Sequence, residues 1–102
     1  MKKVHFYGED LELKKAKYIG NDSLALLLVD QMGQLFSKVT VNVDNVQMPN
    51  ENTAVVKDYS ENEGILDALK EAGVEFKVVG SVQMPFNYCP LVEFNLDDVD
   101  DI

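Results

Sequence analysis

The stretch SENEGILDALKEAGV, residues 60–74, carries the strongest signal of secondary structure in the chain. Ser60 is the expected N-cap, and Glu63 three residues later completes a capping box in which each side chain accepts a hydrogen bond from an otherwise unpaired backbone N–H. Gly73 suits the position just beyond the last helical turn. The spacing predicts an amphipathic helix over residues 61–72 with an apolar stripe made of Ile65, Leu66, Leu69 and Ala72.

Alternating apolar and polar residues before this helix predict four strands in two hairpins. In the fourth strand, Leu35, Val39, Val41 and Val43 fall on one face, which is typical of a half-buried antiparallel strand. The third strand contains LALLLV, which is apolar on both faces, so we expect it to be central in a sheet or covered by a partner. The four strands are expected at residues 3–7, 11–18, 23–29 and 35–43, with turns at 8–10 and 30–34.

The rest of the chain predicts three further strands and an acidic tail. Residues 53–58, 75–79 and 90–96 are typical of strands, and the Asn- and Pro-containing stretch 44–52 is typical of a loop. We therefore predict an α+β fold, a mostly antiparallel sheet of about six or seven strands with one amphipathic helix packed on one face. Residues 1–96 are expected to form a single domain, and the acidic tail 97–102 is expected to fray.

Composition narrows the classes of protein to which the chain can belong. Its 102 residues suffice for one domain core, and 46% hydrophobic and 26% charged residues are globular proportions. The net charge of −9 and the lack of arginine argue against direct binding to nucleic acid or to an anionic membrane surface. Because the chain has one cysteine, no apolar signal segment and no run of about 20 apolar residues, we expect a cytoplasmic protein.

No residue pattern in the chain matches an enzyme, metal or cofactor site. Cys89 is the only cysteine and His5 the only histidine, and neither lies in a catalytic Cys/His signature or completes a zinc ligand set. DYSENEG at 58–64 has the oxygen spacing that opens an EF-hand loop, but its glycine is one position late and Leu69 replaces the bidentate glutamate. We therefore expect a non-enzymatic protein with no cofactor and no metal, in which the Cys89 thiol is structural.

Acidic residues are concentrated in the second half of the chain, where residues 44–102 hold three lysines and 13 acids. Glu63, Asp67 and Glu71 are spaced i, i+4 and i+8, so they share one face of the predicted helix. Exposed helix faces are ordinarily charged, and Lys70 lies within this row, so solvation alone accounts for it. The sharper hypothesis is an acidic partner-binding surface formed by Glu63, Asp67, Glu71, Asp97, Asp98, Asp100 and Asp101.

Three stretches in this order resemble the domain-of-unknown-function family numbered 4313. They are SLALLLVD with GQLFSKVTVNV, then ENEGILDALKEAGV, then GSVQMPFNYCPLVEFNL, and the resemblance covers residues 18–96. It implies the same fold and a small protein carried by bacterial plasmids, conjugative elements or phages, with no catalytic residues to transfer. This chain has VQMPFN where a glycine-containing turn is expected before the last strand.

From these features we expect a mobile-element accessory protein that acts by binding another protein. An alternative is a DNA mimic that inhibits a host defence or DNA-binding protein. The helix row carries a charge about every 6 Å against about 3.4 Å along a DNA strand, so the tail must contribute to such a mimic. A third hypothesis is a small-molecule-binding or catalytic domain. We also expect self-association, since one helix cannot cover both the core face and the face formed by Ala25, Leu27 and Val29.

Overall fold

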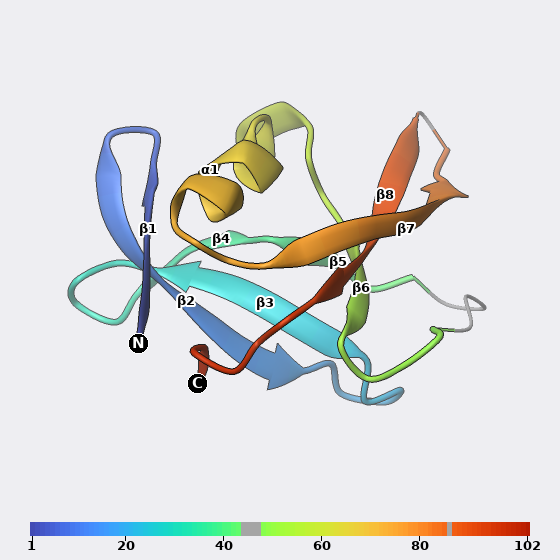
Figure 1. Ribbon diagram of the computed structural model, residues 1–102, viewed down its shortest axis with the longest axis horizontal. Helices are drawn as coiled ribbons and strands as arrows, with labels where there is room; N and C mark the ends of the chain where they lie inside the picture. Colours follow the sequence, from blue (N-terminus) through green and yellow to red (C-terminus); the bar gives the residue numbers. More distant parts are fainter. Residues whose placement is uncertain (44–47, 86) are drawn as a thin grey trace.

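The computed structural model describes residues 1–43, 48–85 and 87–102, and these contain two β-sheets and one α-helix (Figure 1). The α+β class with mainly antiparallel strands is confirmed, but the nine strands exceed the predicted number and form two sheets. Part of the predicted loop 44–52 lies outside the described residues. Sheet A contains β1 (Lys2–Phe6), β2 (Glu9–Lys17), β3 (Leu24–Val29), β4 (Leu35–Lys38) and β9 (Asp100–Asp101). Sheet B contains β5 (Thr40–Val41), β6 (Thr53–Val56), β8 (Tyr88–Phe94) and β7 (Phe76–Gln83), in that order, and the helix is α1 (Ile65–Glu71).

Two hairpins build sheet A, as predicted. Residues 7–8 connect β1 to β2 with φ values of 49° and 74°, and two positive φ values are what a type I′ hairpin turn needs to match the strand twist. Between β3 and β4, the Asp30 carboxylate accepts hydrogen bonds from the N–H groups of Met32 and Gln34, both at 2.9 Å. Gly33 there has a φ of 78°, which glycine adopts without strain.

The predicted strand 35–43 is wrong as a single strand, because the chain bends at Val39 and changes sheets. The Val39 N–H donates to the Leu26 carbonyl of β3 at 2.8 Å, and the Val39 carbonyl accepts the Lys57 N–H at 2.9 Å, just beyond β6. The bend also breaks the predicted alternation, since Thr40 is buried and Leu35 is 54% exposed. Val39 therefore joins the two sheets.

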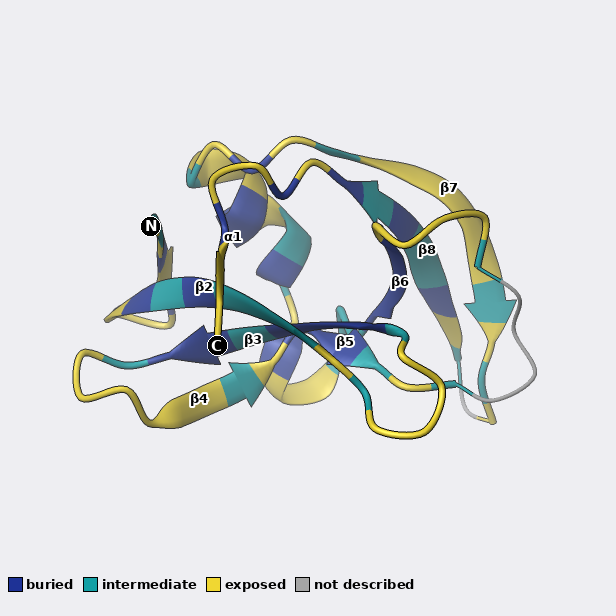
Figure 2. Cartoon of the chain, turned by 90° about the horizontal axis from the view of Figure 1, so that it is seen from below, coloured by how far each residue is buried: buried dark blue, intermediate teal, exposed yellow. Residues whose placement is uncertain are grey.

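The two sheets and the helix enclose one core (Figure 2). In that view sheet A runs along the bottom, sheet B stands steeply to it at the right, and α1 lies above the other end of sheet A. Both sheets and the helix contribute fully buried side chains, among them Leu13, Leu26, Leu28, Val56, Val92, Ile65 and Leu69.

Strand β3, the LALLLV segment, is central in sheet A, as predicted. It lies between β2 and β4, and its core-facing residues include Leu26 and Leu28. On its second face, Ala25 and Val29 are buried and Leu27 is half-buried within the single chain. The chain's own residues therefore cover most of the face from which we predicted self-association.

The helix begins later than predicted and has a different cap. Residues 60–62 form a 3-10 turn, and α1 starts at Ile65 after Gly64, whose φ is 89°. The Asp58 Oδ1 atom accepts the N–H groups of Gly64 at 2.8 Å and Ile65 at 3.2 Å. Ser60 makes no side-chain capping bond here, so the predicted capping box is wrong.

A buried amide explains why the local capping signal fails. The Asn62 side chain is fully buried, where its amide nitrogen donates to the Lys38 carbonyl at 2.5 Å and its oxygen accepts the Ser37 hydroxyl. A buried amide needs such partners, since leaving one unpaired costs about 1–3 kcal/mol. These bonds hold residues 60–62 against the end of β4, and a capping box worth about 1 kcal/mol does not outweigh them.

The end of the helix follows the prediction. Gly73 has a φ of 85°, its N–H donates to the Lys70 carbonyl, and the Val74 N–H donates to the Leu69 carbonyl, both at 3.0 Å. These are the two hydrogen bonds of a Schellman motif. The predicted apolar stripe also faces the core, because its members are buried or packed against buried residues. Within the described residues, no helix has the length and apolar character needed to cross a membrane.

The C-terminal tail, which we predicted to fray, is paired with sheet A. β9 pairs with β2 in parallel, and the Ile102 N–H donates to the Lys15 carbonyl at 3.0 Å. Val99 is only 4% exposed and belongs to the core. The burial of Val99 therefore anchors this segment in the fold. The acidic composition of the segment had suggested a solvated tail.

Candidate protein-binding surface

The structure brings together two of the three acidic residues predicted for one helix face. Asp67 and Glu71 lie four residues apart on α1 and are exposed, with Lys70 beside them. Glu63 lies before the helix, where its backbone carbonyl accepts the Tyr7 hydroxyl at 3.0 Å. The late start of α1 therefore shortens the predicted acidic row.

The four tail carboxylates, all exposed, have different surroundings. Asp98 Oδ2 lies 3.8 Å from Lys2 Nζ, and Asp100 Oδ2 lies 3.4 Å from the N-terminal amine. Asp101 lines a pocket beside β2, whereas Asp97 lines a groove beside β7. Two of the four charges are thus partly compensated by cations of the same chain.

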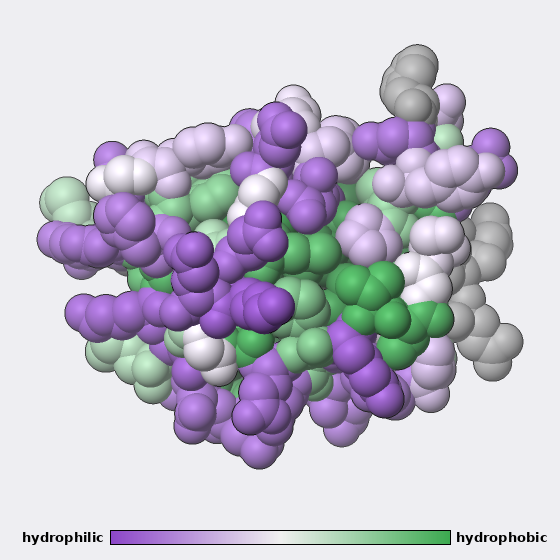
Figure 3. All heavy atoms as spheres, turned by 45° about the horizontal axis from the view of Figure 1, so that its top comes forward, coloured by the Kyte–Doolittle hydropathy of each residue, from purple (hydrophilic) through white to green (hydrophobic). Residues whose placement is uncertain are grey.

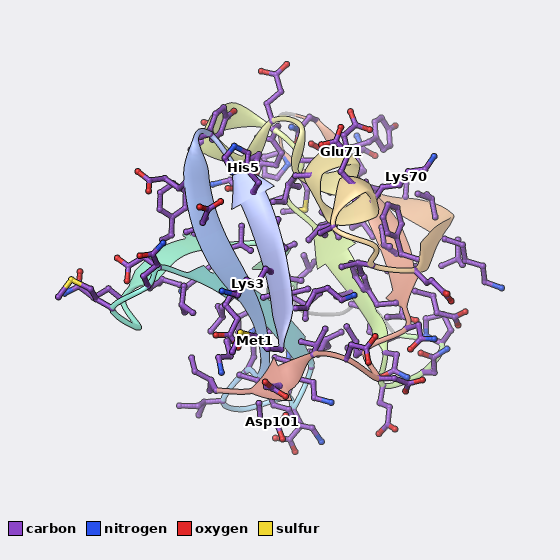
Figure 4. All side chains as sticks on the ribbon, turned by 60° about the vertical axis from the view of Figure 1, so that its left-hand side comes forward. Met1, Lys3, His5, Lys70, Glu71 and Asp101 are labelled. Atoms are coloured by element: carbon purple, nitrogen blue, oxygen red, sulfur yellow. The ribbon has the colours of Figure 1, made fainter. Side chains whose placement is uncertain are left out.

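The helix row and the end of the tail are well separated. Figure 4 shows Glu71 at one end of β1, near His5, and Asp101 beyond the other end, past Met1. Lys3 lies between them on β1. The seven predicted residues are therefore divided among several parts of the surface instead of forming one continuous acidic surface.

An exposed edge strand lies on sheet B. Within the described part of the chain, β7 pairs with β8 alone, and its residues 77–81 are all exposed. A register shift makes Val79 a β-bulge, and Val78 and Val79 are 57% and 43% exposed. Figure 3 shows hydrophobic surface over the part of this face where β7 runs, bordered by hydrophilic side chains. An edge strand also presents a row of backbone N–H and C=O groups, so apolar and hydrogen-bonding groups occur together here.

An acidic groove of about 470 Å³ borders the first residues of β7. Glu75, Glu93 and Asp97 supply three carboxylates to its lining, and Lys77 supplies a cation whose Nζ lies 3.6 Å from Glu93 Oε1. At the other end of β7, residues 80–83 carry no charge. The edge strand therefore has one acidic end and one neutral end.

Sequence reasoning missed the second half of β7. The predicted strand ended at residue 79, just before Gly80, and glycine is depleted in strands. The β-branched Val82 was the available signal for a longer strand. A glycine that follows a bulge weakens the periodic pattern without ending the strand.

The two residues considered for nucleophilic chemistry lie on different sheets. His5 is on β1, where its exposed Nδ1 lies 2.9 Å from Asp10 Oδ1. Cys89 is on β8 and fully buried, and this burial raises the pKa of its thiol more than the nearby Lys57 charge lowers it. A raised pKa leaves less of the reactive thiolate. In the described ranges, no group of three or more His, Cys, Asp or Glu side chains could hold a metal ion.

A pocket that contains a carboxyl with a displaced pKa would favour the hypothesis of a small-molecule-binding or catalytic domain. Here the pocket described next and the carboxyl lie at separate places. The pocket, of about 500 Å³, lies where the C-terminus runs beside β2, and Leu24, Leu96 and Lys15 contribute to its lining. The carboxyl belongs to Glu61, which is exposed and accepts a hydrogen bond from Lys57 that holds its pKa at about 2. The hydrogen bond from Lys57 therefore explains the low pKa, because burial would raise the pKa of a carboxyl.

No known protein family, no curated protein and no solved structure matches the chain. The resemblance to the family numbered 4313 stays a prediction.

Proposed function

We propose that the protein has no catalytic activity and acts by binding another protein through β7 and the surface beside it. The edge position of β7, together with the exposure of Val78 and Val79, is the observation that supports this most. A strand added to such an edge gains main-chain hydrogen bonds, and the neighbouring side chains supply selectivity. Burial of exposed valines adds the apolar contribution to affinity.

The proposed biological setting, a mobile element and the cytoplasm, rests on the sequence alone. The resemblance supports a small accessory protein of a mobile element, and the composition supports a cytoplasmic location. The net charge of −9 without arginine supports a protein partner over nucleic acid or a membrane surface.

The DNA-mimic alternative has weaker support than the binding module. A mimic needs closely spaced charges along one line, since a DNA strand carries one about every 3.4 Å. Here Glu63 lies outside the helix, and Asp98 and Asp100 have cationic neighbours within 4 Å. The β7 edge needs no such continuity.

Capture of partners with three forms of the protein tests the proposal. The baits are the wild type, the double variant Val78→Lys/Val79→Lys, and the control Glu9→Lys on the β1–β2 hairpin. Both changes raise the net charge by two, and all three residues are exposed, so we expect both variants to fold. We expect quantitative mass spectrometry to identify a protein that is captured by the wild type and by Glu9→Lys but not by the double variant. The same difference in binding should be seen with this protein after purification. Equal capture by all three baits would exclude β7 as the binding surface.

A further inference from the structure

We infer that the partner of β7 is an extended protein segment with a basic C-terminal end, which adds to sheet B antiparallel to β7. This inference rests on the proposed function and specifies the chemistry of the partner. It uses three features: the backbone edge of β7, its exposed valines, and the difference in charge between its two ends.

The edge offers room for a full additional strand. β7 has eight residues, longer than the strand of about five or six residues that is typical of globular proteins. Natural edges are usually protected by charge, proline or bulges. β7 contains the bulge at Val79 and one charged residue, Lys77, which already has Glu93 as a neighbour. The exposed valines therefore lie beside a backbone edge that is only lightly protected.

The charges near the first residues of β7 favour a basic segment. Glu75, Glu93 and Asp97 line the groove at this end of the strand, with Glu93 on the neighbouring strand β8, and Lys77 is the cation among the lining residues. The whole chain adds a net charge of −9, which attracts cations at longer range. A segment whose lysines or arginines lie at this end would complement the groove, while its other end would meet the uncharged residues 80–83.

Strand direction then fixes which end of the segment is basic. All strand pairs within sheet B are antiparallel, and antiparallel pairing is the more common and slightly more stable arrangement. In an antiparallel addition, the C-terminal end of the segment lies beside Phe76 and Glu75. The basic residues therefore belong at the C-terminal end.

A second copy of the chain fits this edge less well. Two copies would each bring a net charge of −9, so their association is opposed by repulsion. Antiparallel pairing of two β7 strands would place the acidic groove of each copy beside the neutral end of the other. No complementary charge would be gained.

Three synthetic peptides test the inference with the full-length protein. The first, Ac-STVSVTVKVKK-NH2, has a basic C-terminal end; the second, Ac-KKVKVTVSVTS-NH2, has a basic N-terminal end; the third, Ac-STVSVTVEVEE-NH2, has an acidic C-terminal end. Affinity is measured by fluorescence anisotropy at low and physiological salt. Amide hydrogen exchange by NMR reports which backbone groups become protected.

We expect the first peptide to bind at least about tenfold tighter than the third and measurably tighter than the second, with protection of β7 amides. Val78→Lys/Val79→Lys should weaken its binding at least about tenfold, because it adds charge to the edge that the strand must cover. Glu75→Lys should weaken it about fivefold, as expected of a charge at the border of an interface. Glu9→Lys, with the same change in net charge, should alter it by less than about twofold.

Three results would overturn the inference. They are equal affinity for the basic and acidic peptides, binding that the β7 double variant leaves unchanged, and a wild-type dimer in sedimentation that this variant converts to a monomer. If no peptide binds while partner capture still depends on β7, the inference falls and the proposed function stands. If partner capture is independent of β7, the proposed function falls as well.

Discussion

Asp58 Oδ1 lies 2.8 Å from the backbone nitrogen of Gly64, six residues further along the chain, and accepts its hydrogen bond. It also accepts the N–H of Ile65, so one carboxylate satisfies two backbone donors at the start of α1. A carboxylate at this end also interacts favourably with the helix dipole. The helix is therefore capped by a residue from before the 3-10 turn and not by Ser60.

Removal of this cap should destabilise the domain. Asp58→Ala should lower the free energy of unfolding by about 1–2 kcal/mol, the usual cost of losing an N-cap side chain. Ser60→Ala should change it by less than about 0.5 kcal/mol, as expected of an exposed position without a capping role. Urea unfolding followed by circular dichroism measures both. Asp58→Asn, which keeps an oxygen acceptor, is the control and should lose less than Asp58→Ala; the reverse order for Asp58→Ala and Ser60→Ala would contradict the structure.

The C-terminal segment should contribute to stability through Val99. Val99→Ala removes two methyl groups from a side chain that is 4% exposed, which should cost about 2 kcal/mol. The matched control is Asp97→Ala, because Asp97 is exposed and its side chain is outside the core. Thermal and urea unfolding of both variants measures the difference. Equal stability of the two variants would mean that the segment is not packed as described.

The helix shows which features local sequence patterns can predict and which depend on contacts between residues far apart in the sequence. Periodicity and the Gly73 signal are local, and they predicted the apolar stripe of the helix and its C-terminal end. The position of the helix start depends on Asn62 burying its amide against Lys38, a contact between residues 24 positions apart. Likewise, the bend at Val39 depends on one bond to β3 and one to Lys57 just beyond β6, and local alternation carries no information on either contact.

The candidate binding surface shows the same difference between local sequence features and long-range contacts. The sequence itself shows that acidic residues are concentrated in residues 44–102, but their arrangement in space depends on the late helix start and on the pairing of β9 with β2. The edge position of β7 is a property of strand order, and strand order is not readable from one strand's pattern.

Cys89 should react slowly with thiol reagents in the folded protein. It is fully buried, and burial raises its pKa, so little thiolate is present at pH 8 and access is blocked. We expect labelling by iodoacetamide to be at least about tenfold slower than in the urea-unfolded protein, and to accelerate with the unfolding transition. Labelling as fast in the folded as in the unfolded state would show that the thiol is accessible and would reopen a chemical role.

The Glu61 carboxyl should titrate near pH 2. The hydrogen bond from Lys57 lowers its pKa most, followed by bonds from the Glu61 backbone and the Ser60 side chain. Because the folded pKa of about 2 is below the usual 4.5, the ion pair stabilises the fold above about pH 4.5 and its contribution is lost as the pH falls toward 2. Lys57→Gln should raise the pKa of Glu61 toward its usual value, and Lys57→Arg should preserve most of the shift. Carbon-13 NMR titration of the side-chain carboxyl measures it, and a midpoint above pH 4 in the wild type would refute the pair.

The last prediction separates the binding module from the DNA mimic. We compare the wild type with a neutralised variant, assayed against the purified protein that the wild-type bait captures. Residues 97–102 are kept in this variant, because deleting them would also remove Val99 from the core. The substitutions are Glu63→Gln, Asp67→Asn, Glu71→Gln and Asp101→Asn.

For a binding module that uses β7, the neutralised variant should associate more slowly, while its dissociation rate changes less than about threefold, since charges outside the contact surface act mainly on the association rate. For a DNA mimic, the variant should lose binding, affinity should fall steeply with salt, and duplex DNA should compete for the same basic cleft. Surface plasmon resonance at two salt concentrations, with and without duplex DNA, measures all three quantities. We expect little competition by DNA and a dissociation rate close to that of the wild type; complete loss of binding together with competition by DNA would replace the β7 binding module with the mimic.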